Sequence, residues 1–561
     1  MNSKYKKVSK LDTFFDNFLE KNLLFLVLIT VLLFVLWPVF CVIKESFIVE
    51  GKFTLSLYES LFRDNKKLIY NTLFVGVLST ILSTSISICI SIYASFSNKK
   101  IRNILIIILM ITMISPPFVS SLAYINLFGR RGFITHYVLG LTLNPYGWQG
   151  IVLMQAVSNV SLNSLLLIGI INGVDKNLLM ASRDLGSSTS YAIRKVLIPI
   201  MMPGIMVASL LSFISSIADF GTPMIIGGAF NVLATEVYMR VIAGADIAMA
   251  SSISSLILIP ALIVFIIYRI YMKKNKLKSE ASVKLSSQNI EFKIRGVLGN
   301  IISIVTFLFV VIMILQYGTI FLSSLSKYSR GKIQFTLEHF YNLKNYGLDS
   351  FTRSIIYSFI TGILGSFLGI IIAYYTERRN IKGMKTIDFI STLPYIIPGF
   401  FFGIGYILAF NKYPLELTGT MTIVVLNCIF KQLPMTTKTS SAVISQINRE
   451  IENAARDLGA KNIYVIKDII LPNVKTAFLI GFINNFTATM TTVGAIIFLV
   501  YPGQKVATLE MFDAIQTGNY GVGSAIASII ILSTLIINLI FSKLVLKGRE
   551  FNNVSSTKRF S

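Results

Sequence analysis

Long apolar runs recur along this chain of 561 residues and leave it few possible folds. A run of about 18 or more apolar residues can cross the hydrocarbon core of a bilayer as a helix. We count twelve such runs, at roughly 23–43, 68–95, 104–127, 150–171, 203–220, 250–270, 298–324, 351–375, 386–410, 420–440, 475–500 and 524–545. Charged residues make up only 14% of the chain, against about a quarter in soluble proteins. The sequence therefore predicts an all-α polytopic membrane protein with about twelve transmembrane helices.

Basic residues are distributed unevenly between the loops that join these runs. If the N-terminus is cytoplasmic, the segments on the cytoplasmic side hold 31 of the 51 Lys and Arg residues. Cytoplasmic loops are enriched in Lys and Arg, so this bias predicts a multi-pass protein with both termini in the cytoplasm. Segment 44–67, with five basic residues on the outer side, goes against the trend. Membrane topology also explains the net charge of +25 better than a nucleic-acid surface does, so no nucleic-acid partner is expected.

One short segment occurs twice without any gap between the aligned copies. Ala181-Ser182-Arg183-Asp184-Leu185-Gly186 returns as Ala454-Ala455-Arg456-Asp457-Leu458-Gly459, and Pro199 and Pro472 follow at the same distance from the two glycines. We call the constant spacing from Gly186 to Gly459 the loop offset. Glycine readily adopts the positive φ that ends a helix, and proline suits the first turn of the next helix. We therefore expect a short helix, a glycine turn and a second short helix, which the proline separates from the following span. Such a stiff protrusion suits mechanical coupling to another protein.

This pattern resembles the EAA loop of permease subunits in bacterial ABC importers, which reads Glu-Ala-Ala, three residues, Gly, nine residues, Ile, one residue and Leu-Pro. The resemblance implies the type I importer permease fold, with two parallel six-helix repeats in a bacterial plasma membrane. It also implies that each loop docks on one of two cytoplasmic ATPase subunits. At the family's glutamate this chain has Met180 and Asn453, and Ser182 replaces the second alanine of the first copy. The Ala, Gly and Pro framework that sets the shape is intact.

The resemblance assigns the ATPase-coupling role to eleven residues: Ala181, Arg183, Asp184, Gly186, Pro199, Ala454, Ala455, Arg456, Asp457, Gly459 and Pro472. The Arg and Asp side chains either contact the ATPase or pair with each other. No segment matches Gly-x-x-x-x-Gly-Lys-Ser/Thr, so we expect this chain to bind no nucleotide or other cofactor. ATP and magnesium are then bound by the partner subunits, and this chain is not expected to be an enzyme.

The duplication divides the chain into two halves. We predict a cytoplasmic N-terminal segment at 1–22, a first permease repeat at 23–272, a basic cytoplasmic linker at 273–297, a second repeat at 298–545 and a cytoplasmic tail at 546–561. Parallel repeats of six spans indicate a pathway between the halves. Four prolines interrupt the third and ninth spans and are either pathway residues or simple kinks. They are Pro116, Pro117, Pro394 and Pro398.

Within the permease family, the fused form resembles the ferric-iron importers, a group with thiamine and aminoethylphosphonate relatives. The resemblance extends to two outer segments, 218–238 and 496–521, which would meet an extracytoplasmic substrate-binding protein. These segments hold four acidic residues at the outer mouth: Asp219, Glu236, Glu510 and Asp513. Ferric iron prefers oxygen ligands, but acids on long loops are also typical of solvated or structural groups. No His or Cys spacing predicts a metal site.

A secondary transporter driven by an ion gradient is the alternative of a different class. Such carriers usually hold ionisable residues within their spans, where charge is costly unless it has a function. The nearest case in this chain is Lys431, near the cytoplasmic end of the tenth expected span. Snorkelling of its ammonium group to the membrane surface would explain that lysine. The sequence therefore favours the ATP-driven importer over the gradient-driven carrier.

Overall fold

The computed structural model describes residues 22–49, 51–130, 132–141, 144–175, 177–280, 296–329, 332–379, 381, 383–460, 464–501 and 503–557. Within them, nine helices are long and apolar enough to cross a membrane: Asn22–Glu45, Lys66–Phe96, Trp148–Asn172, Thr189–Ile217, Ile247–Tyr271, Val297–Ser324, Asp349–Arg378, Lys467–Thr491 and Tyr520–Leu544. Two further pairs of helices qualify only together, and each pair is bent at a short break. The described residues therefore contain nine spans, or eleven if each bent pair is one span.

The chain packs as two compact units, each built from both halves of the sequence. Unit 1 comprises Met1–Glu45, Leu348–Ala507 and Leu532–Ser561, and unit 2 comprises Ser46–Gly347 and Thr508–Ile531. The elements of unit 1 are η1 (Leu32–Leu36), α2 (Trp37–Glu45), α16 (Asp349–Arg378), α17 (Met384–Thr392), η5 (Leu393–Tyr395), α18 (Gly399–Phe410), α19 (Met421–Ser445), α20 (Arg449–Asp457), η6 (Val465–Ile470) and α22 (Leu471–Thr491). α23 (Ala507–Gln516) and α24 (Tyr520–Thr557) are divided between the units.

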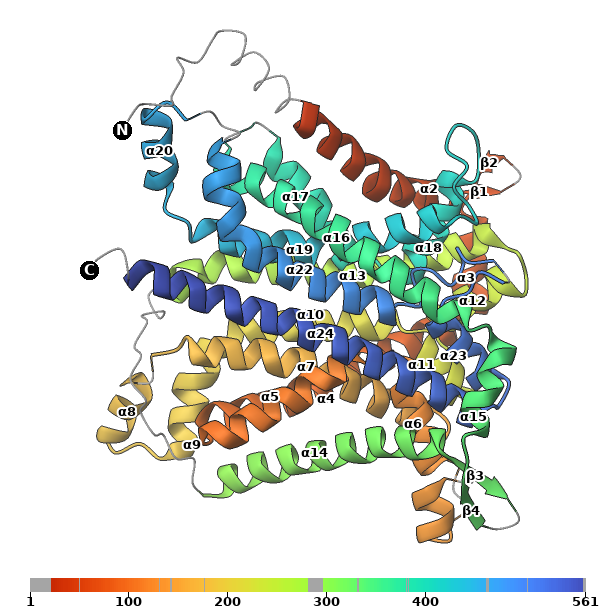
Figure 1. Cartoon of the computed structure of the whole chain (residues 1–561). Coiled ribbons are helices and arrows are strands. Elements are labelled where there is room, and N and C mark those ends of the chain that lie inside the picture. Colours follow the sequence, from red (N-terminus) through yellow and green to blue (C-terminus); the bar gives the residue numbers. More distant parts are fainter. Residues whose placement is uncertain are drawn as a thin grey trace. The chain divides into compact units, whose positions relative to one another are not determined.

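Unit 2 holds most of the remaining elements, in chain order. They are β1 (Ile48–Val49), β2 (Lys52–Phe53), α3 (Ser56–Asp64), α4 (Lys66–Phe96), α5 (Lys99–Ile114), α6 (Phe118–Phe128), η2 (Phe133–Val138), α7 (Trp148–Asn172), α8 (Asn177–Asp184), α9 (Thr189–Ala192), η3 (Ile193–Leu197), α10 (Ile198–Ile217), α11 (Gly221–Ile226), α12 (Leu233–Ile242), α13 (Ile247–Glu280), α14 (Val297–Ser324), β3 (Ser326–Ser329), β4 (Lys332–Phe335), α15 (Glu338–Tyr341) and η4 (Asn342–Tyr346). β1 pairs with β2 and β3 with β4 as antiparallel hairpins. In unit 2 the hairpins lie at one end of the helical bundle, and α8 and α9 at the other (Figure 1).

The first span of each half packs among helices of the other half. In unit 1, α2 packs against α18, and Tyr406 Oη donates a hydrogen bond to Phe34 O at 2.9 Å. In unit 2, α14 runs alongside α4, α5 and α6 (Figure 1). The boundaries that we predicted describe the duplication of the sequence and not this packing, and they stay a prediction.

Small residues bring the second span of each half close to its neighbours. On α4, Ser79, Ser83, Ser87 and Ser91 recur every four residues and are buried. One constant spacing, which we call the span offset, aligns them in order with Thr361, Gly365, Gly369 and Ala373 on α16, which are buried as well. Residues four apart lie on one face of a helix, and small side chains there let helices approach closely in a membrane. Both helices therefore form the centre of their units, α4 against α7 and α10, and α16 against α19 and α22.

One pair of hydrogen-bonded side chains occurs in both halves with its residue types exchanged. Asn163 Nδ2 on α7 donates to Ser212 Oγ on α10 at 2.6 Å. At the loop offset from these two residues, Thr436 Oγ1 on α19 donates to Asn485 Oδ1 on α22 at 3.0 Å. The amide thus lies on the first helix of one pair and on the second helix of the other. Such bonds join helices where no water can satisfy polar groups.

Eleven of the twelve expected runs coincide with the apolar helices and the bent pairs. The twelfth, 420–440, lies in α19, which is long enough to cross a membrane but less apolar than the others. Thr436, Thr437 and Ser440 on this helix are fully buried against other helices of unit 1. Because neighbouring helices shield its polar face from lipid, α19 can cross the membrane although it is less apolar than the other spans.

Candidate functional site

The first repeated loop is a short helix closed by a glycine turn. Three residues of the predicted set lie exposed on α8: Ala181, Arg183 and Asp184. Gly186 follows with a φ of +83°, in the left-handed region that favours glycine. Ser187 N donates to Ser182 O at 3.2 Å, which is the six-residue closing bond of a Schellman cap. The backbone of this loop is therefore fixed by its own hydrogen bonds.

The second repeated loop closes in the same way. Its predicted residues lie on α20, where Ala454 and Asp457 are exposed, Ala455 is half-buried and the Arg456 side chain falls outside the described part of the chain. Gly459 has a φ of +85°, and Ala460 N donates to Ala455 O at 2.9 Å, the counterpart of the first cap at the loop offset. The positive φ that we expected at both glycines is confirmed.

Each proline lies in the first turn of its α-helix, α10 or α22, as expected. Neither proline interrupts the helical chain that leads into the span, so the expected separation of loop and span is wrong. One helix runs without a break from Thr189 to Ile217 across Pro199, and another runs from Lys467 to Thr491 across Pro472. A π-helical turn, η3 or η6, precedes each proline. Proline has no N–H to donate and its ring clashes with the carbonyl four residues back, and a wider turn relieves both problems. Each proline therefore lies within a helix that runs on as a membrane span.

A buried ion pair fixes the second loop to its bundle. Arg378 Nε at the end of α16 lies 3.2 Å from Glu452 Oε1 on α20, and the two side chains are only 3% and 5% exposed. The same guanidinium donates to Ile444 O and Ile447 O at 2.5 Å each, at the C-terminal end of α19. Carbonyl groups at a helix C-terminus carry partial negative charge, so the arginine also caps α19. One side chain thus joins the ends of α16 and α19 to the loop.

Apolar packing fixes the first loop instead. Leu179 of α8 is buried in a cluster with side chains of α4, α7, α10 and α14, and Phe96 packs against the same cluster. Leu179 corresponds to Glu452 at the loop offset, and Phe96 corresponds to Arg378 at the span offset. The two copies therefore make equivalent attachments with different chemistry.

Each loop presents a large apolar side chain at its turn. Leu185 is 90% exposed and Leu458 is 74% exposed, each directly before the capping glycine. Tyr191 and Tyr464, five residues after the glycines, are also exposed in both copies. A leucine is thus exposed at the same place in both capped turns, and such repeated apolar exposure is typical of a surface that contacts another protein.

The four prolines of the expected pathway lie at two sharp bends. Pro116 and Pro117 lie between the helices Lys99–Ile114 and Phe118–His136, which meet at 103°. Pro394 and Pro398 lie at the bend between Met384–Tyr395 and Gly399–Phe410, which meet at 113°. A proline inside a continuous helix produces a far smaller kink. Each of the two expected spans is thus a broken or re-entrant segment.

Lys431 lies at the second bend and not at the membrane surface, so the snorkelling interpretation is wrong. Its Nζ donates to Pro394 O at 2.6 Å and to Ile397 O at 2.5 Å, and it lies 5.9 Å from the centroid of the Phe402 ring. A break in a helix frees carbonyl groups that lipid cannot satisfy. The ammonium group satisfies two of them, which gives this lysine a structural role in unit 1.

Asp219 is engaged by neighbouring donors just after α10. Its Oδ1 accepts from the N–H groups of Gly221 and Thr222 at 3.0 and 3.1 Å, and its Oδ2 accepts from Gln155 Nε2 at 3.1 Å. Burial of the carboxyl raises the pKa of Asp219. Oδ1 thus holds the start of α11 and Oδ2 joins the carboxyl to α7, and a carboxyl engaged in this way is a poor free ligand for a cation.

The other predicted acids lie on α12 and α23. Glu236 forms an ion pair with Arg240 one helical turn later, at 2.7 Å, and Asp246 lies 3.9 Å from the same arginine. Glu510 and Asp513 are half-buried on α23. Within the described residues, no three His, Cys, Asp or Glu side chains are placed to hold a metal ion. The acids of the outer segments therefore do not come together there as a metal site.

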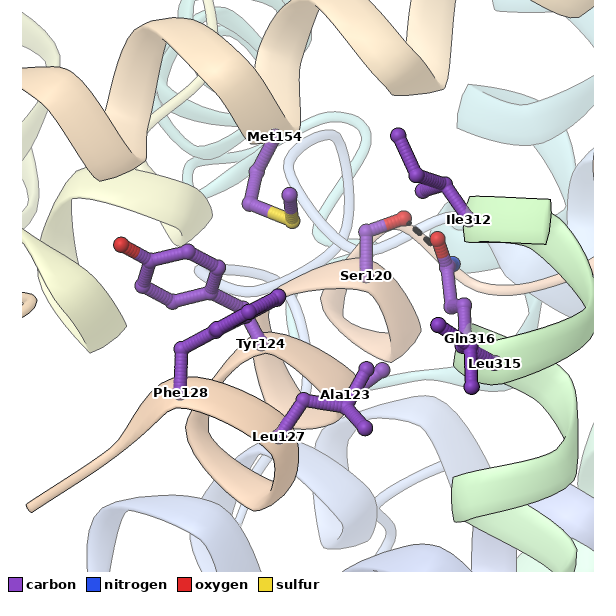
Figure 2. Close-up of a pocket in the computed structure, with 9 residues that line it drawn as sticks. All are labelled: Ser120, Ala123, Tyr124, Leu127, Phe128, Met154, Ile312, Leu315 and Gln316. Carbon is purple, nitrogen blue, oxygen red and sulfur yellow. Dashed lines mark hydrogen bonds between the residues drawn. The ribbon is translucent and has the colours of Figure 1, made fainter. Parts of the chain in front are cut away.

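A small apolar pocket lies between α6, α7 and α14 of unit 2 (Figure 2). Its lining residues are Ser120, Ala123, Tyr124, Leu127, Phe128, Met154, Ile312, Leu315 and Gln316. Gln316 Nε2 donates to Ser120 Oγ at 2.8 Å (Figure 2), and Tyr124 Oη donates to Pro145 O at 2.9 Å. The lining holds no ionisable carboxyl, amino or imidazole group, so the pocket has the chemistry of a hydrocarbon contact rather than of an ion site.

The chain matches the sequence profile of one protein family in both halves. The family is described as the binding-protein-dependent transport system inner membrane component, and the matches cover residues 87–276 and 365–545. The chain belongs to this family. The two matches confirm that this multi-pass inner membrane permease consists of two repeats of the type I importer permease fold.

Individual relatives match different lengths of this permease. The ferric transport system permease protein FbpB of Actinobacillus pleuropneumoniae is 30% identical over 491 residues, which are 85% of this chain and 71% of that protein. The putative ferric transport system permease protein FbpB 1 of Haemophilus influenzae is 29% identical over 505 residues, 88% of this chain and 79% of that protein. The putative 2-aminoethylphosphonate transport system permease protein PhnV of Salmonella paratyphi A is 27% identical over 233 residues, 41% of this chain and 88% of that protein. The similarity to ferric permeases thus extends over both repeats.

Sequence reasoning missed the residues that hold the permease loops and bends in place. Arg378 and Glu452 lie far apart in the chain, and no local pattern predicts that they meet. A useful signal was available in Glu452, because its counterpart in the first copy is the apolar Leu179. A charged residue at a position whose repeat equivalent is buried and apolar predicts a compensating charge nearby.

Proposed function

We propose that this permease is the membrane subunit of an ATP-driven importer that receives its substrate from an extracytoplasmic binding protein. Two copies of a cytoplasmic ABC ATPase bind ATP and magnesium, and each copy docks on one repeated loop. Both termini and both loops lie in the cytoplasm, as the distribution of basic residues favours. The permease contributes no catalytic residue and binds no nucleotide.

The observation that carries this proposal is the matched pair of capped loops. Each has a helix that ends in a left-handed glycine and exposes one leucine, and the helix that carries the following proline runs on as a membrane span. A flexible loop would absorb a displacement, whereas a hydrogen-bonded helix that is continuous with a span passes the displacement on. Two such loops in one chain suit a machine with two docked ATPases, and a gradient-driven carrier has no need of them.

The mechanism that we propose is alternating access. ATP binding draws the two loops together, the halves rock, and the pathway opens outward to accept substrate from the docked binding protein. Hydrolysis then returns the pathway to its inward-facing state. The prolines at the two bends contribute to this pathway, because broken helices are tolerated where they line a cavity. Asp219, Glu236, Glu510 and Asp513 lie near its outer mouth, where Asp219 holds α11 in position.

Ferric iron is the substrate that we propose. Two relatives that are described as ferric transport permeases match most of this chain. Because the described residues hold no cluster of metal-binding side chains, the binding protein supplies the high-affinity recognition. The alternatives are 2-aminoethylphosphonate, which a relative of one-repeat length is described as transporting, thiamine and another small solute.

Substitution of the loop glycines tests the docking of the ATPase. In Gly186→Val with Gly459→Val, the valine cannot adopt the positive φ without strain, although no atom lies within 4 Å of the added Cβ in either copy. Gly518→Val is a matched control, because Gly518 has a φ of +79°, equally open surroundings and a place outside the loops. We expect co-purification of the ATPase to be lost in the double variant and kept in the control. A double variant that still retains the ATPase would refute the docking role.

Uptake into proteoliposomes tests the energy source and the substrate. The permease is reconstituted with its ATPase inside the vesicles, and the loaded binding protein is added outside. We expect ferric uptake that requires both ATP and the binding protein. Uptake driven by an ion gradient without the ATPase would favour the secondary transporter, and ATP-dependent uptake of only an organic solute would overturn the choice of iron.

A further inference from the structure

A second repeat lies in the segments that follow the first span of each half. Phe53-Thr54-Leu55 returns as Phe335-Thr336-Leu337, and the two triplets are separated by the span offset. The same offset aligns the small residues of α4 with those of α16, so the triplet is in register with the duplication. Neither the loops, the bends nor the outer acids account for this repeat.

Both copies of the triplet form the same element, a β hairpin followed by a short helix. Phe53 and Phe335 are the last residues of β2 and β4. The closing bonds are alike: Thr54 N to Phe47 O at 2.9 Å and Ser56 N to Thr54 Oγ1 at 3.1 Å in one copy, and Thr336 N to Leu325 O at 2.8 Å and Glu338 N to Thr336 Oγ1 at 3.0 Å in the other. Each threonine thus ends its hairpin and starts the helix that follows, α3 or α15.

Each copy has one buried leucine and one exposed apolar pair. Leu61 of α3 and Leu343 of η4, a pair again related by the span offset, are buried, and α3 packs against α4 and α13 of unit 2. The triplets point outward, with exposures of 77% and 52% for Phe53 and Leu55 and of 80% and 69% for Phe335 and Leu337. We call these two exposed pairs the outer knobs. Elements with ordered hydrogen bonds and a buried anchor that still expose a Phe and a Leu in both copies require an apolar partner.

The outer knobs lie next to the ends of membrane spans. β3 begins at Ser326, two residues after α14 ends at Ser324, and α3 ends at Asp64, two residues before α4 begins at Lys66. Two residues of chain reach at most about 7 Å. The exposed apolar surface of α14 continues through Leu322 toward its hairpin. Both hairpins lie at the end of unit 2 away from α8 and α9 (Figure 1).

We propose that the outer knobs insert into the membrane–water interface and that their partner is the lipid bilayer itself. Chain continuity places Phe53, Leu55, Phe335 and Leu337 at the level where spans leave the hydrocarbon core. Aromatic and aliphatic side chains in this zone bury their apolar surface among the upper parts of the acyl chains. A soluble partner would have to reach surfaces that lie at the bilayer, whereas lipid is already there.

The same proposal accounts for three of the five basic residues of segment 44–67, which do not fit the enrichment of Lys and Arg in cytoplasmic loops. Lys52 lies beside Phe53, and Lys66 and Lys67 lie at the start of α4, all with exposed side chains. Lysine side chains at span ends extend toward lipid phosphate groups while their apolar stems stay near the core. In the second copy, Lys327 is held by Glu338 at 2.7 Å, so apolar insertion is the feature that the two knobs share.

Tryptophan fluorescence tests the proposal in the whole permease. The chain has only two tryptophans, Trp37 and Trp148, so the emission added by Phe53→Trp or Phe335→Trp is measured against the parent protein. The proteins are placed in nanodiscs of plain lipid or of lipid with bromine near the headgroup end of the acyl chains. Leu185→Trp is the control, because this side chain is at least as exposed and directly follows α8, which lies at the opposite end of unit 2 (Figure 1).

We expect brominated lipid to quench at least half of the added emission of both knob variants and to leave that of Leu185→Trp unchanged. Bromine near the methyl end of the chains is expected to quench less, since the knobs are interfacial. Leu337→Trp gives a second reading of the same knob if a phenylalanine variant does not fold. Added emission that is equal in plain and brominated lipid would overturn the proposal. Emission that changes only when the binding protein is added would also overturn it, in favour of a protein partner.

Discussion

The buried ion pair of the second loop allows a direct test of how that loop is held. The perturbation is Glu452→Leu, which places at this position the residue type found at Leu179 of the first copy. The variant leaves Arg378 buried, with its two carbonyl bonds but without a counter-charge. The matched variant is Glu452→Leu with Arg378→Phe, which reproduces both members of the apolar attachment through Phe96 and Leu179.

The size of the effect follows from the burial of the pair. Removing one partner of a buried ion pair costs about 3–5 kcal/mol, because the other charge stays desolvated. Because Arg378 keeps its two hydrogen bonds to carbonyl groups, we expect Glu452→Leu to cost about 3 kcal/mol, the lower end of this range. Since each 1.4 kcal/mol is a factor of about ten, detachment of α20 becomes roughly a hundred times more frequent. Replacing both charges by apolar residues is often close to neutral, so the double variant is expected to recover most of the loss.

Hydrogen exchange of the backbone amides in α20 measures this detachment. We expect exchange to be roughly a hundred times faster in Glu452→Leu than in the parent permease and close to the parent rate in the double variant. The amides of α8 serve as an internal control in the same samples, because no part of the ion pair contributes to their attachment. A double variant that exchanges as fast as Glu452→Leu would refute charge compensation as the basis of this attachment.

Three further predictions concern packing, polar contacts and the loops. Gly221→Ala places a Cβ 1.9 Å from the buried Phe118 ring, so we expect a loss of about 1–3 kcal/mol and a lower Tm, while Gly169→Ala, with no atom within 4 Å, keeps the Tm. Gln155→Leu leaves Asp219 Oδ2 without its side-chain donor, so we expect the free energy of unfolding to fall by about 1–3 kcal/mol and the Tm to fall with it. Single valine substitutions of the two loop glycines are expected to reduce transport unequally, because the loops are attached differently; equal losses would contradict this.

Features that depend on near neighbours in the chain were predictable from the sequence. The apolar runs indicated the spans, because a helix in lipid must be apolar over its whole exposed length. The positive φ at Gly186 and Gly459 followed from residue type, since few other residues adopt that conformation. The bends at the proline pairs had a local signal as well, although their angles of 103° and 113° did not.

Features that depend on distant contacts were not predictable. The first span packs in the unit that is otherwise built from the second half of the chain, which brings Phe34 and Tyr406 together. No periodicity in the sequence indicates such a pairing. Lys431 was assigned to the membrane surface because composition alone cannot show two free carbonyls beside it. We expected a break at Pro199, whereas the helix continues across it. The π-helical turn that accommodates the proline has no sequence signal of its own.

The duplication constrains contacts rather than residue types. Asn163 with Ser212 and Thr436 with Asn485 preserve one hydrogen bond between equivalent helices while the amide changes sides. The loop attachments differ further, with an ion pair in one copy and apolar packing in the other. Each residue of such a contact depends on its partner. Replacing one residue of a repeat by its equivalent from the other repeat therefore disrupts the contact unless the partner is replaced as well. Because the second loop is held by a buried charge pair and the first by apolar packing, a mutation that changes charge near the loops should affect the two loops unequally, even though their capped turns are the same.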